Sequence, residues 1–332
     1  MAKIDYSSLL SRSLEITKSH KWLWVYGLVL AIFGAGSGGG GGSSTSSSGG
    51  IPKEVPRELP EKTAQVLGQA TDAFRTWIAN VPTLNWILLI LGFVFLIFFF
   101  VVVGLILKAW AKGGLIAGLV EAEQGLSPTL ASTSPVGIAK IKNLIILSLL
   151  VTGITFGLIL VLGIFFLVPY LILGNSSLKV VWTILAILFG GLAFVLALVL
   201  LAMTNIYAER LIVLRGFSPW QAWKKGLKLS KGSFLPTLMM GIINQAIGCS
   251  VGCLGTIILM VILGIPALMV ILPVFKGGFH WPGWPTIIFL GILFLVFLNL
   301  NYLIRALLTV FNYSNWNLFF KEIIKEETSN EG

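Results

Sequence analysis

Side chains that could carry out chemistry are few in this chain, and they do not form a catalytic set. The two histidines, His20 and His280, are expected on opposite sides of a membrane, so they cannot share a metal ion or act as an acid–base pair. Cys249 and Cys253 lie four residues apart without further ligands, which favours helix packing over a metal site. No glycine loop of the ATP-binding type occurs in the sequence. We therefore predict a non-enzymatic protein without a cofactor or a metal.

Polar side chains within hydrophobic stretches are better candidates for function, because lipid penalises them. Five such residues occur in the last two hydrophobic stretches: Asn244, Gln245, Asn299, Asn301 and Arg305. They predict a polar cavity that faces the cytoplasm. The alternative is that they form hydrogen bonds between helices and extend from helix ends toward water.

A second polar group ends the fourth hydrophobic stretch. It consists of Thr204, Asn205, Glu209 and Arg210. Glu209 is expected at a similar depth to Arg305, so the two side chains could form an ion pair. No acidic residue is expected at the centre of a span, which leaves proton or sodium coupling without an obvious carrier.

The composition indicates the solvent in which these residues must be placed. Hydrophobic residues make up 56% of the 332 residues and charged residues only 11%, whereas a soluble domain carries about 25% charged residues. This much apolar surface cannot be buried in one aqueous core, so we predict an all-α integral membrane protein. The net charge of +10 indicates basic loops beside anionic lipid headgroups rather than a nucleic-acid partner.

Charge-free stretches long enough to cross the hydrocarbon core recur along the chain. We predict about six transmembrane helices within a single membrane domain, 1–332. The spans are placed near 21–36, 84–108, 142–173, 177–207, 234–275 and 285–311. Lysine and arginine are concentrated in the flanks on one side, which places both termini in the cytoplasm.

Two of these spans leave alternatives open. The apolar run from Trp22 to Phe33 is short, so it suits either a span or the core of a cleaved signal peptide. The stretch 234–275 is long enough for one kinked span or for two short spans, and two spans would move the C-terminus to the outside.

The first external loop has two predicted parts. Residues 34–50 are almost entirely glycine and serine, which predicts a flexible loop. Residues 61–81 carry apolar side chains at helical spacing, which predicts an extracytoplasmic amphipathic helix.

An internal repeat is indicated by matching cytoplasmic segments. Residues 10–18 align with 223–231, and both segments lead directly into a span. Ser134 and Ser218 each precede a proline, as an N-cap serine precedes proline at the first helical position. These matches predict three repeats, each an amphipathic helix followed by two spans. The three amphipathic helices are expected at 4–20, 134–142 and 218–231.

The helix expected at 218–231 combines an apolar edge with a basic face. Trp220, Trp223 and Leu227 form the edge at helical spacing. The candidate contacts to anionic lipid are Lys224, Lys225, Lys228 and Lys231. Such a helix rests in the headgroup layer as an anchor. Specific recognition of a lipid, or docking of a protein partner, is the alternative interpretation.

Several motifs around this helix carry a resemblance to a known family. They are 207–210 (Tyr-Ala-Glu-Arg), 216–219 (Gly-Phe-Ser-Pro), 222–226 (Ala-Trp-Lys-Lys-Gly), 231–234 (Lys-Gly-Ser-Phe) and 263–266 (Leu-Gly-Ile-Pro). In these segments the chain resembles the glycerophosphoryl diester phosphodiesterase membrane domain and related membrane domains of unknown function. The resemblance implies a six-helix domain in a prokaryotic plasma membrane. It does not imply phosphodiesterase activity, which in that family belongs to a separate soluble barrel.

From the sequence we predict a membrane scaffold or accessory subunit, whose basic helices hold lipid and a protein partner. The alternative is a transporter or lipid-handling protein with a polar cavity facing the cytoplasm. The sequence does not identify the substrate, the partner or the oligomeric state.

Overall fold

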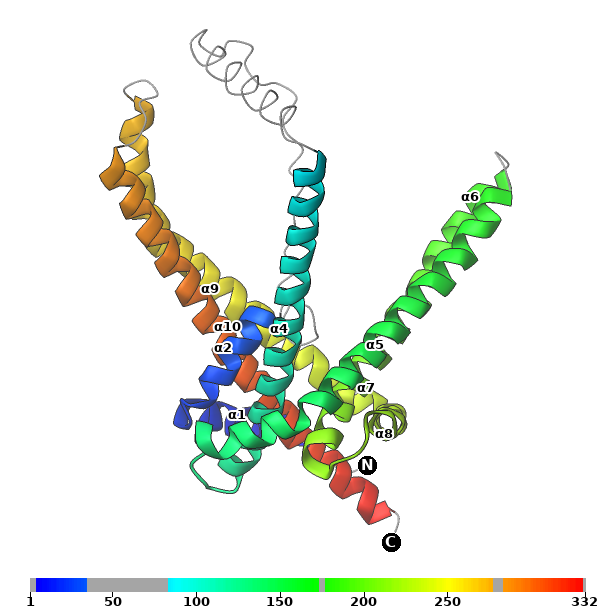
Figure 1. The fold of residues 1–332 in the computed structure, drawn as a ribbon. Helices are drawn as coiled ribbons and strands as arrows, with labels where there is room; N and C mark the ends of the chain where they lie inside the picture. Colours follow the sequence, from blue (N-terminus) through cyan, green and yellow to red (C-terminus); the bar gives the residue numbers. More distant parts are fainter. Residues whose placement is uncertain (1–3, 35–82, 173–176, 277–282, 331–332) are drawn as a thin grey trace. The chain divides into compact units, whose positions relative to one another are not determined.

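The structure is a computed structural model that describes residues 4–34, 83–172, 177–276 and 283–330 (Figure 1). Among these residues nearly all are helical and no strand occurs, which confirms the predicted all-α class. The chain divides into two compact units, one formed by Met1–Gly41 with Leu105–Gly332 and the other by Gly42–Gly104. The predicted loop and outer helix, 34–50 and 61–81, lie outside the described residues except for Gly34.

Within the part of the chain that the structure describes, five helices are long and apolar enough to cross a membrane, which is compatible with a multi-pass membrane protein. They are α4 (Thr83–Glu123), α5 (Leu130–Ile172), the continuous run of α6 (Ser177–Leu185), η1 (Ala186–Gly190) and α7 (Gly191–Arg215), α9 (Phe234–Lys276) and α10 (Trp284–Asn330). Helices α4, α5, α7 and α10 extend beyond one end of the predicted spans 84–108, 142–173, 177–207 and 285–311. These extensions enter the packed core that holds the polar residues.

The first predicted span is the exception. Helix α2 (Leu23–Phe33) has 11 residues, and about 20 are needed to cross the hydrocarbon core. Its side chains Leu23, Tyr26 and Leu30 are nevertheless buried in the core. The Tyr26 hydroxyl also lies 2.8 Å from the Thr133 hydroxyl of α5. Helix α2 is therefore an integral part of the folded unit, and the number of spans stays a prediction.

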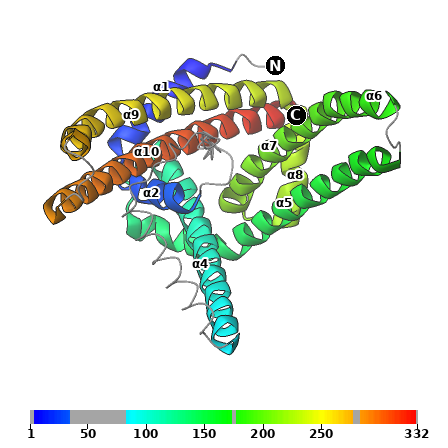
Figure 2. The same ribbon diagram turned by 90° about the horizontal axis from the view of Figure 1, so that it is seen from above.

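The long helices of the larger unit form two hairpins. Helix α9 runs beside α10, and α5 runs beside α6 to α7 (Figures 1 and 2). Helix α9 is continuous from Phe234 to Lys276, so the stretch that the sequence left open forms one helix rather than two. Along both hairpins large apolar side chains are exposed, Phe156, Leu254 and Phe294 among them. Aqueous solvent disfavours so much contiguous apolar surface, and lipid accepts it.

The core of this unit lies where the ends of these helices meet two shorter helices, α1 (Tyr6–Ser19) and α8 (Pro219–Gly232). Asp5 caps α1 by accepting hydrogen bonds from the backbone N–H groups of Ser7 and Ser8. Tyr6 donates a hydrogen bond to the Pro236 carbonyl of α9 at 3.3 Å. Burial raises the pKa of this tyrosine hydroxyl.

Glycines allow α4 and α5 to approach closely in this core. A Cβ atom on Gly113 would lie 2.9 Å from the Cα atom of Gly137, and a Cβ atom on Gly137 would lie 2.7 Å from the Trp110 carbonyl oxygen. Small residues bring helix backbones together in membrane proteins, where van der Waals contact rather than the hydrophobic effect drives association. The close crossing holds the part of α4 around Gly113 beside α5.

The connection between α7 and α8 follows from three residues. Gly216 ends α7 with φ of 71°, and its N–H donates to the Ile212 carbonyl oxygen. Ser218 stands at the N-cap of α8 in extended conformation, although its side chain makes no capping hydrogen bond, and Pro219 occupies the first turn. The matching Ser134 lies inside α5, which begins at Leu130, so residues 134–142 form no separate helix. The threefold repeat stays a prediction.

Substitution of Gly226 tests the packing of α8 on α7. A Cβ atom on Gly226 would lie 2.9 Å from the Thr204 carbonyl oxygen, and a backbone atom cannot move away alone. We expect Gly226→Ala to lower the free energy of unfolding by about 1–3 kcal/mol, measured as thermal unfolding in detergent. Gly232→Ala is the control, because a Cβ atom there meets nothing within 4 Å. Equal stability of the two variants would contradict this packing.

Candidate functional site

A buried ion pair joins α4 to α7. The Lys112 ammonium contacts the Glu209 carboxylate, and the two side chains are 10% and 6% exposed. The amide nitrogen of Asn205, one turn earlier on α7, donates to the same carboxylate oxygen at 3.0 Å. The expected pair between Glu209 and Arg305 is therefore corrected. Arg305 lies exposed on α10, and the nearer ammonium of Lys112 occupies the carboxylate.

Arg210 is a second buried cation, placed on α7 directly after Glu209. Its guanidinium donates to the carbonyl oxygens of Ile206 at 2.8 Å and Tyr313 at 3.4 Å. It also lies 5.7 Å from the centre of the Tyr313 ring, within the range of a cation–π contact. The Nε atom is buried without a hydrogen bond among the described residues. Arg210 thus has carbonyl and ring partners on α7 and α10, and its own charge is not cancelled by a contacting carboxylate.

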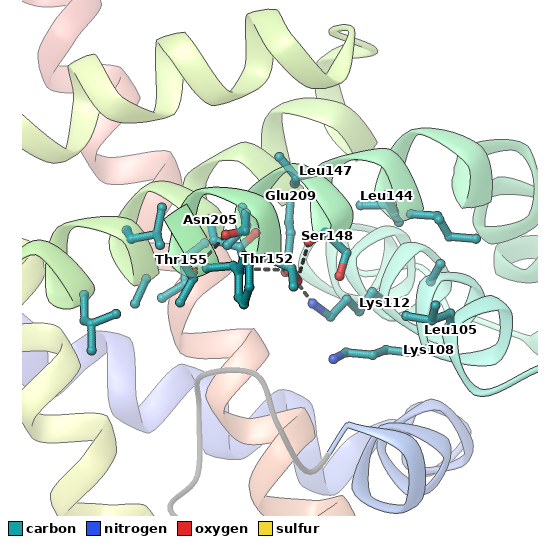
Figure 3. A pocket seen from close by; sticks show the side chains of 18 of the residues that line it. Leu105, Lys108, Lys112, Leu144, Leu147, Ser148, Thr152, Thr155, Asn205 and Glu209 are labelled. Carbon is teal, nitrogen blue, oxygen red and sulfur yellow. Dashed lines mark hydrogen bonds and ion pairs between the residues drawn. The ribbon is translucent and has the colours of Figure 1, made fainter. Parts of the chain in front are cut away.

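A cavity of about 510 Å³ adjoins the ion pair, which is the size of a small-molecule site. Three helices line it: α4, α5 and α7. Its polar lining consists of Lys108, Lys112, Ser148, Thr152, Thr155, Asn205 and Glu209, and most of the other lining residues are aliphatic. Figure 3 shows Lys108 and Lys112 reaching from α4 toward the side chains of α5 and α7.

Polarity changes along the cavity. At one end Lys112 and Glu209 are paired, with Ser148 close to them in Figure 3. Farther along the same helices the walls are Phe156 and Ile159 of α5 and Leu198 of α7. The lining of α5 extends from Leu144 to Ile159, a helical rise of roughly 22 Å. The cavity therefore offers a charged end and an elongated apolar wall, as an amphiphilic molecule requires.

Lys108 is the second lysine of α4 that lines the cavity. It lies one helical turn from Lys112 on the same face of α4, because residues four apart are neighbours on a helix. Its side chain is half-buried. No carboxylate of the described residues forms an ion pair with it, whereas Glu209 is already held by Lys112 and Asn205. Lys108 is the cation of the cavity that can receive an anionic group from outside the chain.

The five residues singled out in the sequence are not brought together. None of them lines this cavity. Asn244 is buried and accepts a hydrogen bond from Asn315 of α10 at 2.8 Å. Asn301 accepts one from Thr256 of α9 at 3.3 Å, and Asn299 donates to the Leu295 carbonyl oxygen of its own helix at 2.8 Å. Gln245 and Arg305 are exposed.

The residues that do line the cavity had a signal in the sequence. Lys108 and Lys112 are spaced four apart at the end of one predicted span, and Asn205 and Glu209 are spaced four apart at the end of another. Each pair predicts a polar face on a helix. The sequence does not show that the two faces meet, because that depends on how α4 packs against α7.

The two cysteines lie next to each other on one helix. Cys249 and Cys253 are exposed on α9, with sulfur atoms 3.9 Å apart. Among the described residues no group of three or more histidine, cysteine, aspartate or glutamate side chains could hold a metal ion.

The lysines of α8 lie on the opposite side of that helix from its packing surface. Ala222, Gly226, Leu229 and Ser230 are buried, whereas Lys224, Lys228 and Lys231 are exposed and Lys225 is half-buried. The rings of Trp220 and Trp223 are stacked at 5.5 Å. The Lys224 ammonium lies 5.1 Å from the centre of the Trp220 ring. The exposed face therefore carries both aromatic and basic groups.

Comparisons with known proteins found no matching family model, no matching curated protein and no matching solved structure. The resemblance to the membrane domain family therefore stays a prediction, and function has to be argued from the residues of the site.

A double-mutant cycle tests the ion pair. We expect Lys112→Met or Glu209→Gln alone to destabilise the protein by about 3–5 kcal/mol, because each leaves a buried charge without its partner. The double variant should lose clearly less than the sum of the two losses. The measurement is thermal unfolding of the four proteins in detergent.

The matched control is the pair Lys321 and Glu123, whose side chains are 33% and 15% exposed and whose atoms lie 2.5 Å apart. The same cycle there, with Lys321→Met and Glu123→Gln, should give a coupling of about 1 kcal/mol or less. Additive losses at Lys112 and Glu209 would show that the two side chains do not pair.

Proposed function

We propose that this chain is an integral membrane protein that binds and handles a membrane lipid, with the lipid held in the cavity between α4, α5 and α7. The single observation that carries the proposal is the polarity of that cavity. Charged and hydroxyl side chains lie at one end, and Phe156, Ile159 and Leu198 line the other. A phospholipid has the same division between headgroup and acyl chain.

The surroundings of the cavity support a lipid rather than a water-soluble ligand. The helices that form it expose apolar side chains beyond it, Leu160 of α5 and Leu196 of α7 among them. The apolar exposed faces of α5 and α7 beside the cavity suit entry of a lipid sideways from the bilayer. A soluble substrate would leave the long apolar wall unused.

The scaffold interpretation has less support. It needs basic surfaces and a partner, and the exposed lysines of α8 supply only the first of these. The described residues of the cavity do not offer a free acid and base pair for catalysis, because Glu209 is held by Lys112 and Asn205. We therefore place the cavity at the centre of the proposed function and do not propose an enzyme.

Filling the cavity tests the proposal. Ala202 of α7 lines the cavity, and a tryptophan there would occupy much of its apolar part. We expect Ala202→Trp to lose lipid that the wild-type chain retains through gentle extraction, measured as bound lipid by native mass spectrometry. Ala193→Trp is the matched control, since Ala193 is also exposed on α7 but does not line the cavity.

The outcomes separate clearly. Retained lipid in the wild type and in Ala193→Trp, together with its loss in Ala202→Trp, supports the proposal. Equal lipid occupancy in all three folded proteins, or none in the wild type, would exclude the cavity as a lipid site.

A second contact with lipid is proposed for α8. Its exposed Trp220, Lys224 and Lys231 suit the boundary between acyl chains and anionic headgroups, where each lysine gains roughly 1 kcal/mol. The buried face of small residues holds the helix against α7, so the basic face is presented to the surroundings. This supports α8 as the helix that rests on the membrane surface, with the predicted cytoplasmic placement.

Chemical labelling checks the placement of α8. In nanodiscs of phosphatidylglycerol, we expect an amine-reactive reagent to modify Lys224 and Lys231 about fivefold more slowly than in nanodiscs of phosphatidylcholine. The readout is peptide mass spectrometry. Lys325 is the internal reference, because its ammonium is paired with Glu322 at 2.9 Å near the end of α10. Identical rates for Lys224 in both lipids would contradict contact with anionic headgroups.

A further inference from the structure

The balance of charge around the cavity limits which lipid it can hold. Among the described residues, Lys108, Lys112 and Glu209 line the cavity and Arg210 follows Glu209 on α7, so three cations accompany one carboxylate and two positive charges are not matched within this cluster. Lys112 and Arg210 are buried. Buried or half-buried charge without a counter-charge is costly in surroundings of low dielectric constant. An anionic ligand would lower that cost, and a cationic one would raise it.

The partners of the three cations indicate that Lys108 is the one that can bind an anionic group of a ligand. Lys112 is committed to Glu209, and Arg210 is directed to the carbonyl oxygens of Ile206 and Tyr313. Lys108 has neither kind of partner among the described residues, and Figure 3 shows its nitrogen beside that of Lys112. It also lines the cavity one helical turn from Lys112. A phosphate bound to Lys108 would lie next to the charged end and leave the apolar wall to an acyl chain.

Among the described residues that line the cavity, Glu209 is the one carboxylate, and it is not available to an ammonium headgroup. Glu209 already receives the Lys112 ammonium and the Asn205 amide. The ammonium of phosphatidylethanolamine, or the choline group of phosphatidylcholine, would lie close to Lys108 and Lys112 without a partner. Like charges at such distances repel strongly where water is scarce.

We infer that the cavity selects a phospholipid with a net negative headgroup, whose phosphate is bound by Lys108 and whose acyl chain lies along Phe156, Ile159 and Leu198. This inference rests on the proposed function and adds the class of lipid to it. Lys108 is thus a specificity-determining residue, and Lys112 and Glu209 position it by fixing α4 against α7.

The test is competition between lipids on the full-length protein. Wild type in detergent is incubated with an equal mixture of palmitoyl-oleoyl phosphatidylglycerol and phosphatidylethanolamine, and bound lipid is identified by native mass spectrometry. We expect phosphatidylglycerol to be enriched in the wild type. In Lys108→Ala the enrichment should fall about five- to tenfold, while lipid of either class remains bound along the apolar wall. Lys108→Arg should retain the enrichment.

Two controls complete the experiment. Lys142→Ala removes an exposed lysine of α5 that does not line the cavity and has no proposed contact with lipid, and it should leave the enrichment unchanged. Inorganic phosphate added in excess tests a soluble anion as the ligand. If phosphate does not displace the lipid, the anion belongs to a lipid headgroup, whereas displacement of phosphatidylglycerol by phosphate alone would overturn the assignment to a lipid.

Failure of this inference differs from failure of the proposed function. Lipid that is bound without preference, and equally by wild type and Lys108→Ala, would overturn the selection of an anionic headgroup and leave the lipid cavity intact. If Ala202→Trp retains as much lipid as the wild type, the proposed function itself falls. A loss of all lipid from Lys108→Ala with unchanged thermal unfolding would still assign the headgroup to Lys108.

Discussion

The ion pair between Lys112 and Glu209 is the constraint on which the arrangement of α4 and α7 depends. Within surroundings that exclude water, each charge needs the other, because removal of one partner leaves a charge without solvation. The pair fixes the position of α4 along its axis relative to α7. Lys108 then lines the cavity one helical turn from Lys112. The geometry of the candidate site therefore follows from the need of the buried Glu209 carboxylate for a charged partner.

Close helix packing makes this pairing possible. Gly113 and Gly137 let α4 and α5 approach until their backbones are in contact, and Gly226 does the same for α8 against α7. The resulting core contains hydrogen bonds between helices that are distant in sequence, such as Asn315 with Asn244 at 2.8 Å. Beyond the core the hairpins expose apolar side chains that lipid can solvate. The hydrogen-bonded polar side chains and the exposed apolar side chains thus lie in different parts of the long helices.

The polar cavity predicted from the sequence and the cavity in the structure are lined by different residues. Asn244, Gln245, Asn299, Asn301 and Arg305 were selected because polar groups are costly in lipid. Asn244 and Asn301 instead bond to residues of the facing helix, as the alternative interpretation of interhelical hydrogen bonds expected. Lys108 and Lys112 were assigned only to the basic flank of a span, because hydropathy marks them as an end and not as a lining. The spacing of residues along one helix does not show which face of another helix it will contact.

The sequence by itself determined the all-α class and the long apolar helices, because hydrophobic length and backbone hydrogen bonding leave few alternatives in lipid. It also marked the start of α8 at Pro219, where local conformation decides. Only the tertiary structure decided that Glu209 pairs with Lys112 rather than Arg305, and that α2 packs in the core despite its 11 residues. Those outcomes depend on distances between helices, and side-chain spacing along one helix carries no information about the neighbour it will meet.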